Sequence, residues 1–146
     1  MKSFERLQPK SWEEAVQLLA TAKSDKVHAE AKGAGTELLD RLKEYNLAPD
    51  RIIDLRRLAS HSSIRRNSSG GLSIGALVTL TTVAEGVRAD LPALADACEG
   101  AATPQIRNAA TLAGNLCQRP RCWYFRSSEF QCLKKGGVEC LAKSGE

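Results

Sequence analysis

Two short glycine-containing segments carry residue types that could hold a phosphorylated ligand. The first, Gly33-Ala34-Gly35-Thr36, follows a short extended run and precedes leucines at helical spacing. A helix N-terminus presents unpaired N–H groups and partial positive charge, and glycine lets the backbone approach a ligand closely. Taken alone, the segment is compatible with a pyrophosphate cradle and equally with an ordinary glycine turn between strand and helix. Its spacing fits neither the dinucleotide fingerprint nor a Walker loop.

The second segment is Thr111-Leu112-Ala113-Gly114-Asn115. It offers a hydroxyl, an amide and a stretch of bare backbone to a ligand, because small side chains let the backbone come close. Taken alone, however, the segment favours a buried strand of small residues. Two glycine-bearing loops together argue for one shared ligand more strongly than either loop alone.

Four of the five cysteines, Cys117, Cys122, Cys132 and Cys140, fall within 24 consecutive residues. In a reducing compartment such a cluster favours a metal or an iron–sulfur cluster over disulfides. No spacing is the close Cys-x2-Cys pair typical of structural zinc, and single cysteines at irregular spacing suit a 4Fe–4S cluster better. Free thiols that happen to lie close in sequence are the alternative.

Composition excludes several classes. The 146 residues are 42% hydrophobic and 26% charged, which predicts one globular domain or two small ones and excludes a disordered or collagen-like chain. No apolar run approaches the ~18 residues of a membrane span, and the first six residues lack the apolar core of a signal peptide. We therefore expect a cytoplasmic protein without a membrane segment; export together with a partner subunit stays open.

The net charge of +4 lies mostly at the C-terminal end. Residues 116–146 hold six Lys/Arg against three Asp/Glu, whereas residues 1–115 hold 15 against 14. Aromatic residues beside these arginines are compatible with base stacking, but a neutral body argues against nucleic acid as the partner.

Periodicity predicts the elements that must position these residues. Ser11 and Glu14 form a capping-box pattern, in which the Ser11 hydroxyl accepts from the Glu14 N–H and the Glu14 carboxylate reaches back to the Ser11 N–H, so we expect a helix over about residues 12–22. A strand then leads into the glycine loop, a helix runs to about Tyr45, and residues 51–55 form an apolar strand. Residues 1–55 thus predict a small, mainly parallel β-α-β-α-β sheet.

A second α+β region is expected from residue 56. Strands over 62–64 and 72–75 flank a glycine turn, Thr82 caps a helix to about Ala89, and Pro92 opens a helix over 93–99. No period survives beyond residue 116, so the remainder is expected to be an irregular loop.

Taken together, the segments 31–39, 72–79 and 105–116 resemble the FAD-binding (medium) subunit of the molybdenum hydroxylases. This is the xanthine dehydrogenase, carbon monoxide dehydrogenase and aldehyde oxidoreductase family. The resemblance implies an α+β, PCMH-type FAD-binding fold: residues 1–55 as the first subdomain, 56–116 as the start of the second, and 117–146 as an incomplete cysteine-rich iron–sulfur loop. The family subunit continues well beyond this length, so we expect the chain to be its N-terminal portion.

The resemblance implies FAD contacts from both glycine-containing loops and no catalytic acid or base. The implied contact residues are Glu30, Ala31, Lys32, Gly33, Ala34, Gly35, Thr36, Glu37, Leu38, Thr111, Gly114 and Asn115. The first loop differs from the family pattern at Ala34, where relatives have glycine, and this restricts the backbone if that position needs a positive φ.

The tail resembles an insertion found in one branch of the family, that of periplasmic-type aldehyde oxidoreductases and 4-hydroxybenzoyl-CoA reductase, whose flavin subunit carries an extra 4Fe–4S cluster. By resemblance, Cys122, Cys132 and Cys140 are cluster ligands. The fourth ligand is expected beyond residue 146, with Cys117 as the alternative.

The implied function is electron transfer from iron–sulfur clusters to flavin and then to an external acceptor, within an oxidoreductase whose isolated flavin subunit is inactive. The implied partners are a molybdopterin-binding large subunit and a 2Fe–2S small subunit. A small zinc- or iron–sulfur-binding interaction module without flavin is the alternative function.

Overall fold

The computed structural model describes residues 2–44, 46–58 and 61–144. Its first part is a three-stranded parallel sheet of β1 (Glu5–Leu7), β2 (Ala29–Lys32) and β3 (Arg51–Asp54), in the order β1-β3-β2. Parallel strands need crossovers, which α1 (Trp12–Ser24) and α2 (Thr36–Lys43) provide. The β-α-β-α-β pattern expected from the sequence is confirmed, although the predicted end of the second helix, at Tyr45, lies outside the described residues.

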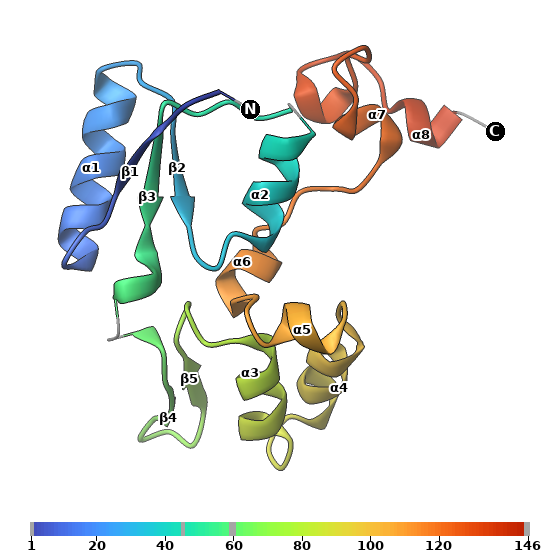
Figure 1. Cartoon of the computed structure of the whole chain (residues 1–146). Coiled ribbons are helices and arrows are strands. Elements are labelled where there is room, and N and C mark those ends of the chain that lie inside the picture. Colours follow the sequence, from blue (N-terminus) through green and yellow to red (C-terminus); the bar gives the residue numbers. More distant parts are fainter. Residues whose placement is uncertain (1, 45, 59–60, 145–146) are drawn as a thin grey trace.

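The central strand β3 packs against both helices (Figure 1), because successive side chains in a strand point to opposite faces. Ile52 joins Leu38 and Leu42 of α2 in one buried cluster. Ile53 joins Ala15 of α1 in another. The sheet is thus buried on both faces, and the carboxyl ends of its strands are fixed relative to one another.

The N-terminus of α1 corrects one detail of the sequence prediction. The Ser11 hydroxyl accepts a hydrogen bond from the Glu14 N–H at 3.1 Å, as expected. The Glu14 carboxylate, however, accepts from the Lys10 N–H at 2.7 Å rather than from the Ser11 N–H. The helix continues to Ser24, two residues beyond the predicted end.

The second part begins with the short 3-10 helix η1 (Leu55–Arg57) and an antiparallel hairpin of β4 (Ile64–Arg66) and β5 (Leu72–Ile74). The first strand lies two residues later than predicted. In the turn, the Asn67 side-chain oxygen accepts from the Gly71 N–H at 2.7 Å and closes the loop.

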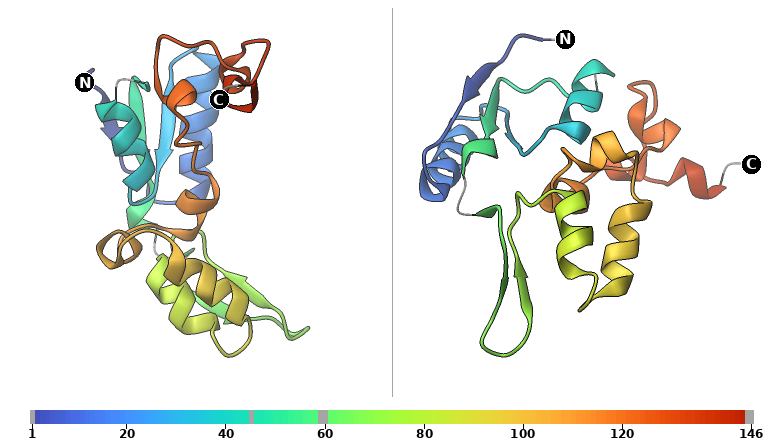
Figure 2. Two further views of the ribbon diagram at one scale, coloured as in Figure 1. Left: turned by 90° about the vertical axis from the view of Figure 1, so that its right-hand side faces the viewer. Right: turned by 60° about the horizontal axis from the view of Figure 1, so that its bottom comes forward.

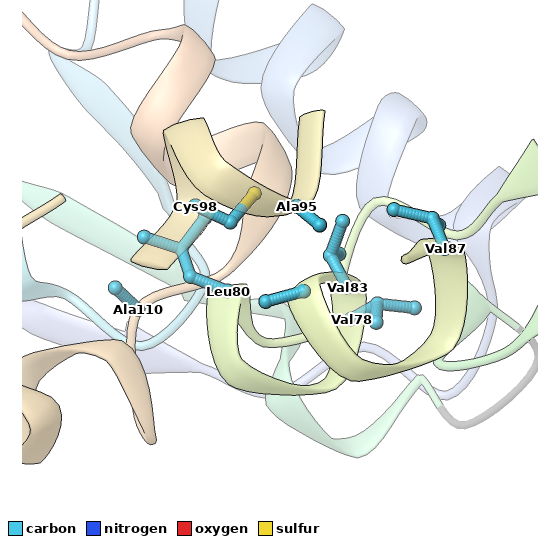
Figure 3. Close-up of a cluster of buried hydrophobic side chains, with 8 residues drawn as sticks. Val78, Leu80, Val83, Val87, Ala95, Cys98 and Ala110 are labelled. Atoms are coloured by element: carbon cyan, nitrogen blue, oxygen red, sulfur yellow. The ribbon is translucent and has the colours of Figure 1, made fainter. Parts of the chain in front are cut away.

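Three helices follow and pack against one another, with α3 next to the hairpin (Figure 1): α3 (Leu80–Val87), α4 (Pro92–Gly100) and α5 (Pro104–Arg107). Thr79, not Thr82, caps α3: its hydroxyl accepts from the Thr82 N–H at 3.2 Å, so the helix begins earlier than predicted. Figure 3 shows the core of this part, a cluster of small apolar side chains. Its labelled members are Val78, Leu80, Val83, Val87, Ala95, Cys98 and Ala110.

Helix α6 (Leu112–Leu116) connects this part to a tail whose described residues form three short helical segments: α7 (Trp123–Arg126), η3 (Leu133–Lys135) and α8 (Leu141–Ser144). The tail lies near α2 and at the opposite end of the molecule from the β4–β5 hairpin (Figures 1 and 2). In the described part of the chain, no helix is long and apolar enough to cross a membrane.

Candidate functional site

A pocket of about 140 Å³ lies where the first glycine loop meets the segment after Ala110. Strand β2 leads directly into this loop and α2 starts directly after it, so the loop occupies the carboxyl edge of the parallel sheet, where ligands bind in open α/β sheets. The lining residues are Glu30, Ala31, Lys32, Gly33, Ala34, Gly35, Thr36, Glu37, Leu38, Arg41, Thr111, Gly114 and Cys117. The structure therefore brings both predicted loops to one place.

Eleven of the twelve expected contact residues line this pocket. The exception, Asn115, lines a neighbouring pocket together with Thr36 and Gly114. Arg41 and Cys117 line the pocket without having been predicted as ligand contacts. Helical spacing could have identified Arg41, which lies four residues after Glu37 and so on the same face of α2.

The glycines of the first loop have specific structural reasons. A Cβ atom on Gly33 would lie 2.8 Å from Thr111 Oγ1, so only glycine permits this approach of the two loops. Gly35 has a φ of +92°, which favours glycine. Ala34 is not among the residues with positive φ. The departure from the family pattern at position 34 therefore costs no backbone strain.

The second loop is held by hydrogen bonds to the segment before α3. The Leu112 N–H donates to the Val78 carbonyl at 2.8 Å, and the Ala113 N–H to the Ala76 carbonyl at 3.1 Å. The buried Thr111 hydroxyl accepts from the Gly114 N–H at 3.2 Å and caps α6. The segment is thus a helix start, and the buried strand that its small residues favour when it is considered alone is wrong.

Lys32 connects the first loop to a buried carboxylate at the end of β3. Its Nζ lies 3.6 Å from Asp54 Oδ2 and donates to the Gly33 carbonyl at 3.3 Å. Asp54 is fully buried and also accepts from Arg6 and Arg56, with Nη2–Oδ2 distances of 2.8 Å for both arginines. These three cations around one carboxylate leave an excess of positive charge beside the pocket, which favours an anionic ligand.

The ionisation of both groups follows from these contacts. Burial alone would raise the pKa of Asp54, but the hydrogen bonds from Arg56 and the charge of Lys32 outweigh it and hold that pKa well below its usual value. Burial lowers the pKa of Lys32, and the Asp54 charge opposes this shift.

The predicted cluster ligands are arranged differently from the expectation. Within residues 2–44, 46–58 and 61–144, no three His, Cys, Asp or Glu side chains lie together in a way that could hold a metal ion. Cys132 is buried and precedes η3, Cys122 is half-buried and precedes α7, and Cys140 is exposed, like Cys117. The cysteines therefore do not fit a 4Fe–4S cluster in this arrangement, and the cluster stays a prediction from the resemblance.

The physical reason is local backbone bonding of the tail. The Lys135 and Gly137 N–H groups both donate to the Cys132 carbonyl, at 2.8 and 3.0 Å, and the Leu133 N–H donates to the Glu139 carbonyl at 2.7 Å. These bonds close the chain around η3 without a metal. The spacing of the cysteines along the sequence does not reveal these backbone turns around Cys132.

Comparison with known proteins now identifies the family. Residues 2–122 match the family described as the FAD binding domain in molybdopterin dehydrogenase. The chain belongs to this family.

Two FAD-binding subunits are similar to this chain over most of its length. The chain is 43% identical over 114 residues to the aldehyde oxidoreductase FAD-binding subunit PaoB of Escherichia coli (strain K12), covering 76% of this chain and 36% of PaoB. It is 37% identical over 106 residues to a xanthine dehydrogenase FAD-binding subunit of Escherichia coli O157:H7, covering 71% and 35%. The chain thus spans little more than a third of the length of these relatives.

Solved structures confirm the fold class. A carbon monoxide dehydrogenase from Hydrogenophaga pseudoflava aligns with a TM-score of 0.71 and 36% identity, covering 77% of this chain and 39% of that one. Quinoline 2-oxidoreductase from Pseudomonas putida 86 aligns with a TM-score of 0.71 and 31% identity, covering 80% and 40%. The α+β fold of this FAD-binding family is therefore established for the chain. The close approach at Gly33, the positive φ of Gly35 and the cationic edge fit the phosphates of the cofactor that gives the family its name.

Proposed function

We propose that this chain is the N-terminal, FAD-binding part of an electron-transfer subunit in a molybdenum-containing dehydrogenase. The observation that carries the proposal is the pocket at the carboxyl edge of the parallel sheet, which residues of both glycine-containing loops line together. The names of the relatives support it, since they are FAD-binding subunits of an aldehyde oxidoreductase and a xanthine dehydrogenase.

In this proposal, residues 30–38 hold the pyrophosphate from one side, and Thr111, Gly114 and Asn115 approach it from the other. The backbone at Gly33 and Gly35 comes close to the phosphates because neither position carries a Cβ. Residues 1–55 and 56–116 are two subdomains that contribute one loop each, and 117–146 form a separate cysteine-rich loop. None of these side chains acts as an acid or base.

When bound, FAD supplies the electron-transfer chemistry between iron–sulfur centres and an external acceptor. The protein contributes binding and electrostatics. The partners in this proposal are a molybdopterin-binding large subunit and a 2Fe–2S small subunit, and the isolated chain is inactive as an oxidoreductase. We also place the subunit in the cytoplasm, because four cysteines within 24 residues suit a metal-binding tail in a reducing compartment.

Titration of the purified chain with FAD, followed by flavin fluorescence, tests the proposal. We expect saturable binding of FAD, weaker binding of FMN, which has one phosphate, and competition by inorganic pyrophosphate. Riboflavin, which has no phosphate, is the matched control. Equal affinity for FAD and riboflavin, or no flavin binding at all, would contradict a pyrophosphate cradle in this pocket.

Metal analysis of the same preparation tests the predicted membership of the cluster-containing branch. About four iron and four acid-labile sulfide per chain would support an extra 4Fe–4S cluster. Stoichiometric zinc without flavin binding would instead support a small zinc-binding interaction module.

A further inference from the structure

Arg126 in the cysteine-containing tail pairs with two carboxylates at the helix that follows the first glycine loop. The side chain of Arg126, at the end of α7, is 11% exposed. Its Nη2 lies 3.1 and 3.2 Å from the two carboxylate oxygens of Glu37, and its Nη1 lies 2.7 Å from Glu44. Its Nε donates to the Pro120 carbonyl at 3.0 Å, which holds the guanidinium in place.

Glu37 has two roles in this geometry. It stands in the first turn of α2 and lines the candidate FAD pocket, where Glu30 is the other carboxylate among the lining residues. A carboxylate facing a pyrophosphate repels it unless a cation is paired with that carboxylate. Arg126 is that cation, and the backbone N–H of Arg119 adds a second tail contact to Glu37 at 3.3 Å.

Glu44 provides the internal comparison. It is the second partner of Arg126, but its side chain is 46% exposed and it is not among the residues that line the pocket. If Arg126 served only to attach the tail to α2, its pairs with Glu37 and with Glu44 would have the same role. Only Glu37 connects the arginine to the ligand-facing surface.

We propose that Arg126 is a positioning residue for the cofactor pocket, which neutralises Glu37 from the tail and so lets the pocket accept a pyrophosphate. This inference rests on the proposed function. It follows that the conformation of the tail controls FAD affinity: a rearrangement that withdraws Arg126 leaves an unpaired carboxylate in the pocket. The tail thereby acts on the flavin site through charge, whether or not it holds a metal.

A double-mutant cycle tests this coupling through the FAD dissociation constant of the purified chain. We expect Arg126→Gln to weaken FAD binding on the order of tenfold, because the Glu37 charge is left unpaired. The same substitution made in Glu37→Gln protein is expected to change the dissociation constant less than about twofold. Raising the salt concentration is expected to reduce the penalty in the first background only.

Arg88→Gln is the matched control. Arg88 pairs with Asp96 at 3.1 Å and with Glu99 at 2.7 Å, is 46% exposed and lines neither this pocket nor the neighbouring one that contains Asn115, so we expect unchanged FAD affinity. If Arg126→Gln lowers the urea midpoint too far for titration, Arg126→Lys replaces it: it keeps the charge but loses the two-oxygen contact, and intermediate affinity is expected.

Equal penalties for Arg126→Gln in both backgrounds would overturn the inference, because a merely structural role does not depend on the charge of Glu37. A wild-type chain that fails to bind FAD contradicts the proposed function instead. A wild-type chain that binds FAD and shows no coupling contradicts the inference alone.

Discussion

The glycine loop and the cysteine tail are both candidate ligand-binding segments, but they are held in place in different ways. The loop joins β2 to α2, and its geometry is set by the register of the parallel sheet and by buried side chains such as Ile52, Ile53 and Asp54 on β3. Within residues 117–143, the buried hydrophobic side chains are Phe125 and Cys132. The tail is attached instead by polar contacts to α2.

This difference teaches which segment can be formed before its ligand binds. A loop fixed by a packed sheet already has its binding geometry, and the structure shows its pocket. The tail exposes large apolar side chains, Trp123 at 89% and Val138 at 97%, and does not gather its cysteines. The arrangement of the tail depends on a few charged pairs. Substitutions in the glycine loop and in the tail should therefore have clearly different effects.

The largest loss of unfolding free energy is expected for Asp54→Asn, which removes the buried negative charge that pairs with Arg6, Lys32 and Arg56. Breaking a buried ion pair costs about 3 kcal/mol of unfolding free energy. The pKa of Asp54 is lower in the folded state than its ordinary value. The stability that the Asp54 charge contributes is therefore fully present above the ordinary carboxyl pKa, and it is lost as the pH falls from there through the folded-state pKa. The stability difference between wild type and variant should therefore narrow from pH 7 to pH 3 in urea denaturation.

Asp50→Asn is the control for that experiment. Asp50 pairs with Lys2 at 2.6 Å, but its side chain is 44% exposed. An exposed pair contributes little in water, so its urea midpoint should stay close to wild type. A large loss at Asp50, or none at Asp54, would contradict the view that the sheet edge organises the loop.

A smaller effect is expected for Gly33→Val, which tests the contact between the two loops. Any Cβ at this position meets Thr111 Oγ1 at 2.8 Å, and such overpacking costs about 2 kcal/mol. Separation of the loops should also weaken FAD binding strongly, measured by flavin fluorescence. Gly100→Ala is the control, since a Cβ there has no neighbour within 4 Å. Equal behaviour of the two variants would show that the loops do not share one ligand.

The sequence was sufficient for features governed by local patterns. Ser11 before an apolar period predicts the start of α1, and the run Ile52-Ile53 predicts an apolar strand, which the structure places at the centre of the sheet. Glycines after a strand predict the ligand-facing loop, because few other residues allow a positive φ or a close approach. The sequence predicts Thr82 as the cap of α3, whereas Thr79 caps it. The two residues have the same side chain and both lie next to an apolar stretch, so the local pattern does not distinguish them.

Features that depend on distant pairs could not be predicted. Arg126 and Glu37 are 89 residues apart, and nothing in either local pattern selects the other. The separation of the cysteines depends likewise on turns around Cys132 whose hydrogen bonds are formed by the backbone, not by a recognisable motif. The family resemblance predicts the fold and the class of cofactor. The contact between the tail and α2 is visible only in the three-dimensional structure.

Thiol labelling gives the sharpest test of the tail, and it is the prediction with the smallest expected effect on stability. Cys117 and Cys140 are exposed, so they should react with iodoacetamide first and at similar rates in the metal-free protein. Cys98 and Cys132 are buried and should react only on unfolding; burial also raises the pKa of the Cys98 thiol, and the thiolate is the reactive form. Peptide mass spectrometry measures the labelling of each cysteine.

Of the two exposed thiols, only Cys140 belongs to the predicted ligand triad. If Cys140 is protected relative to Cys117 and this protection disappears on iron chelation, the tail refolds around a cluster. Equal labelling before and after chelation would show that the separated cysteines are the working arrangement.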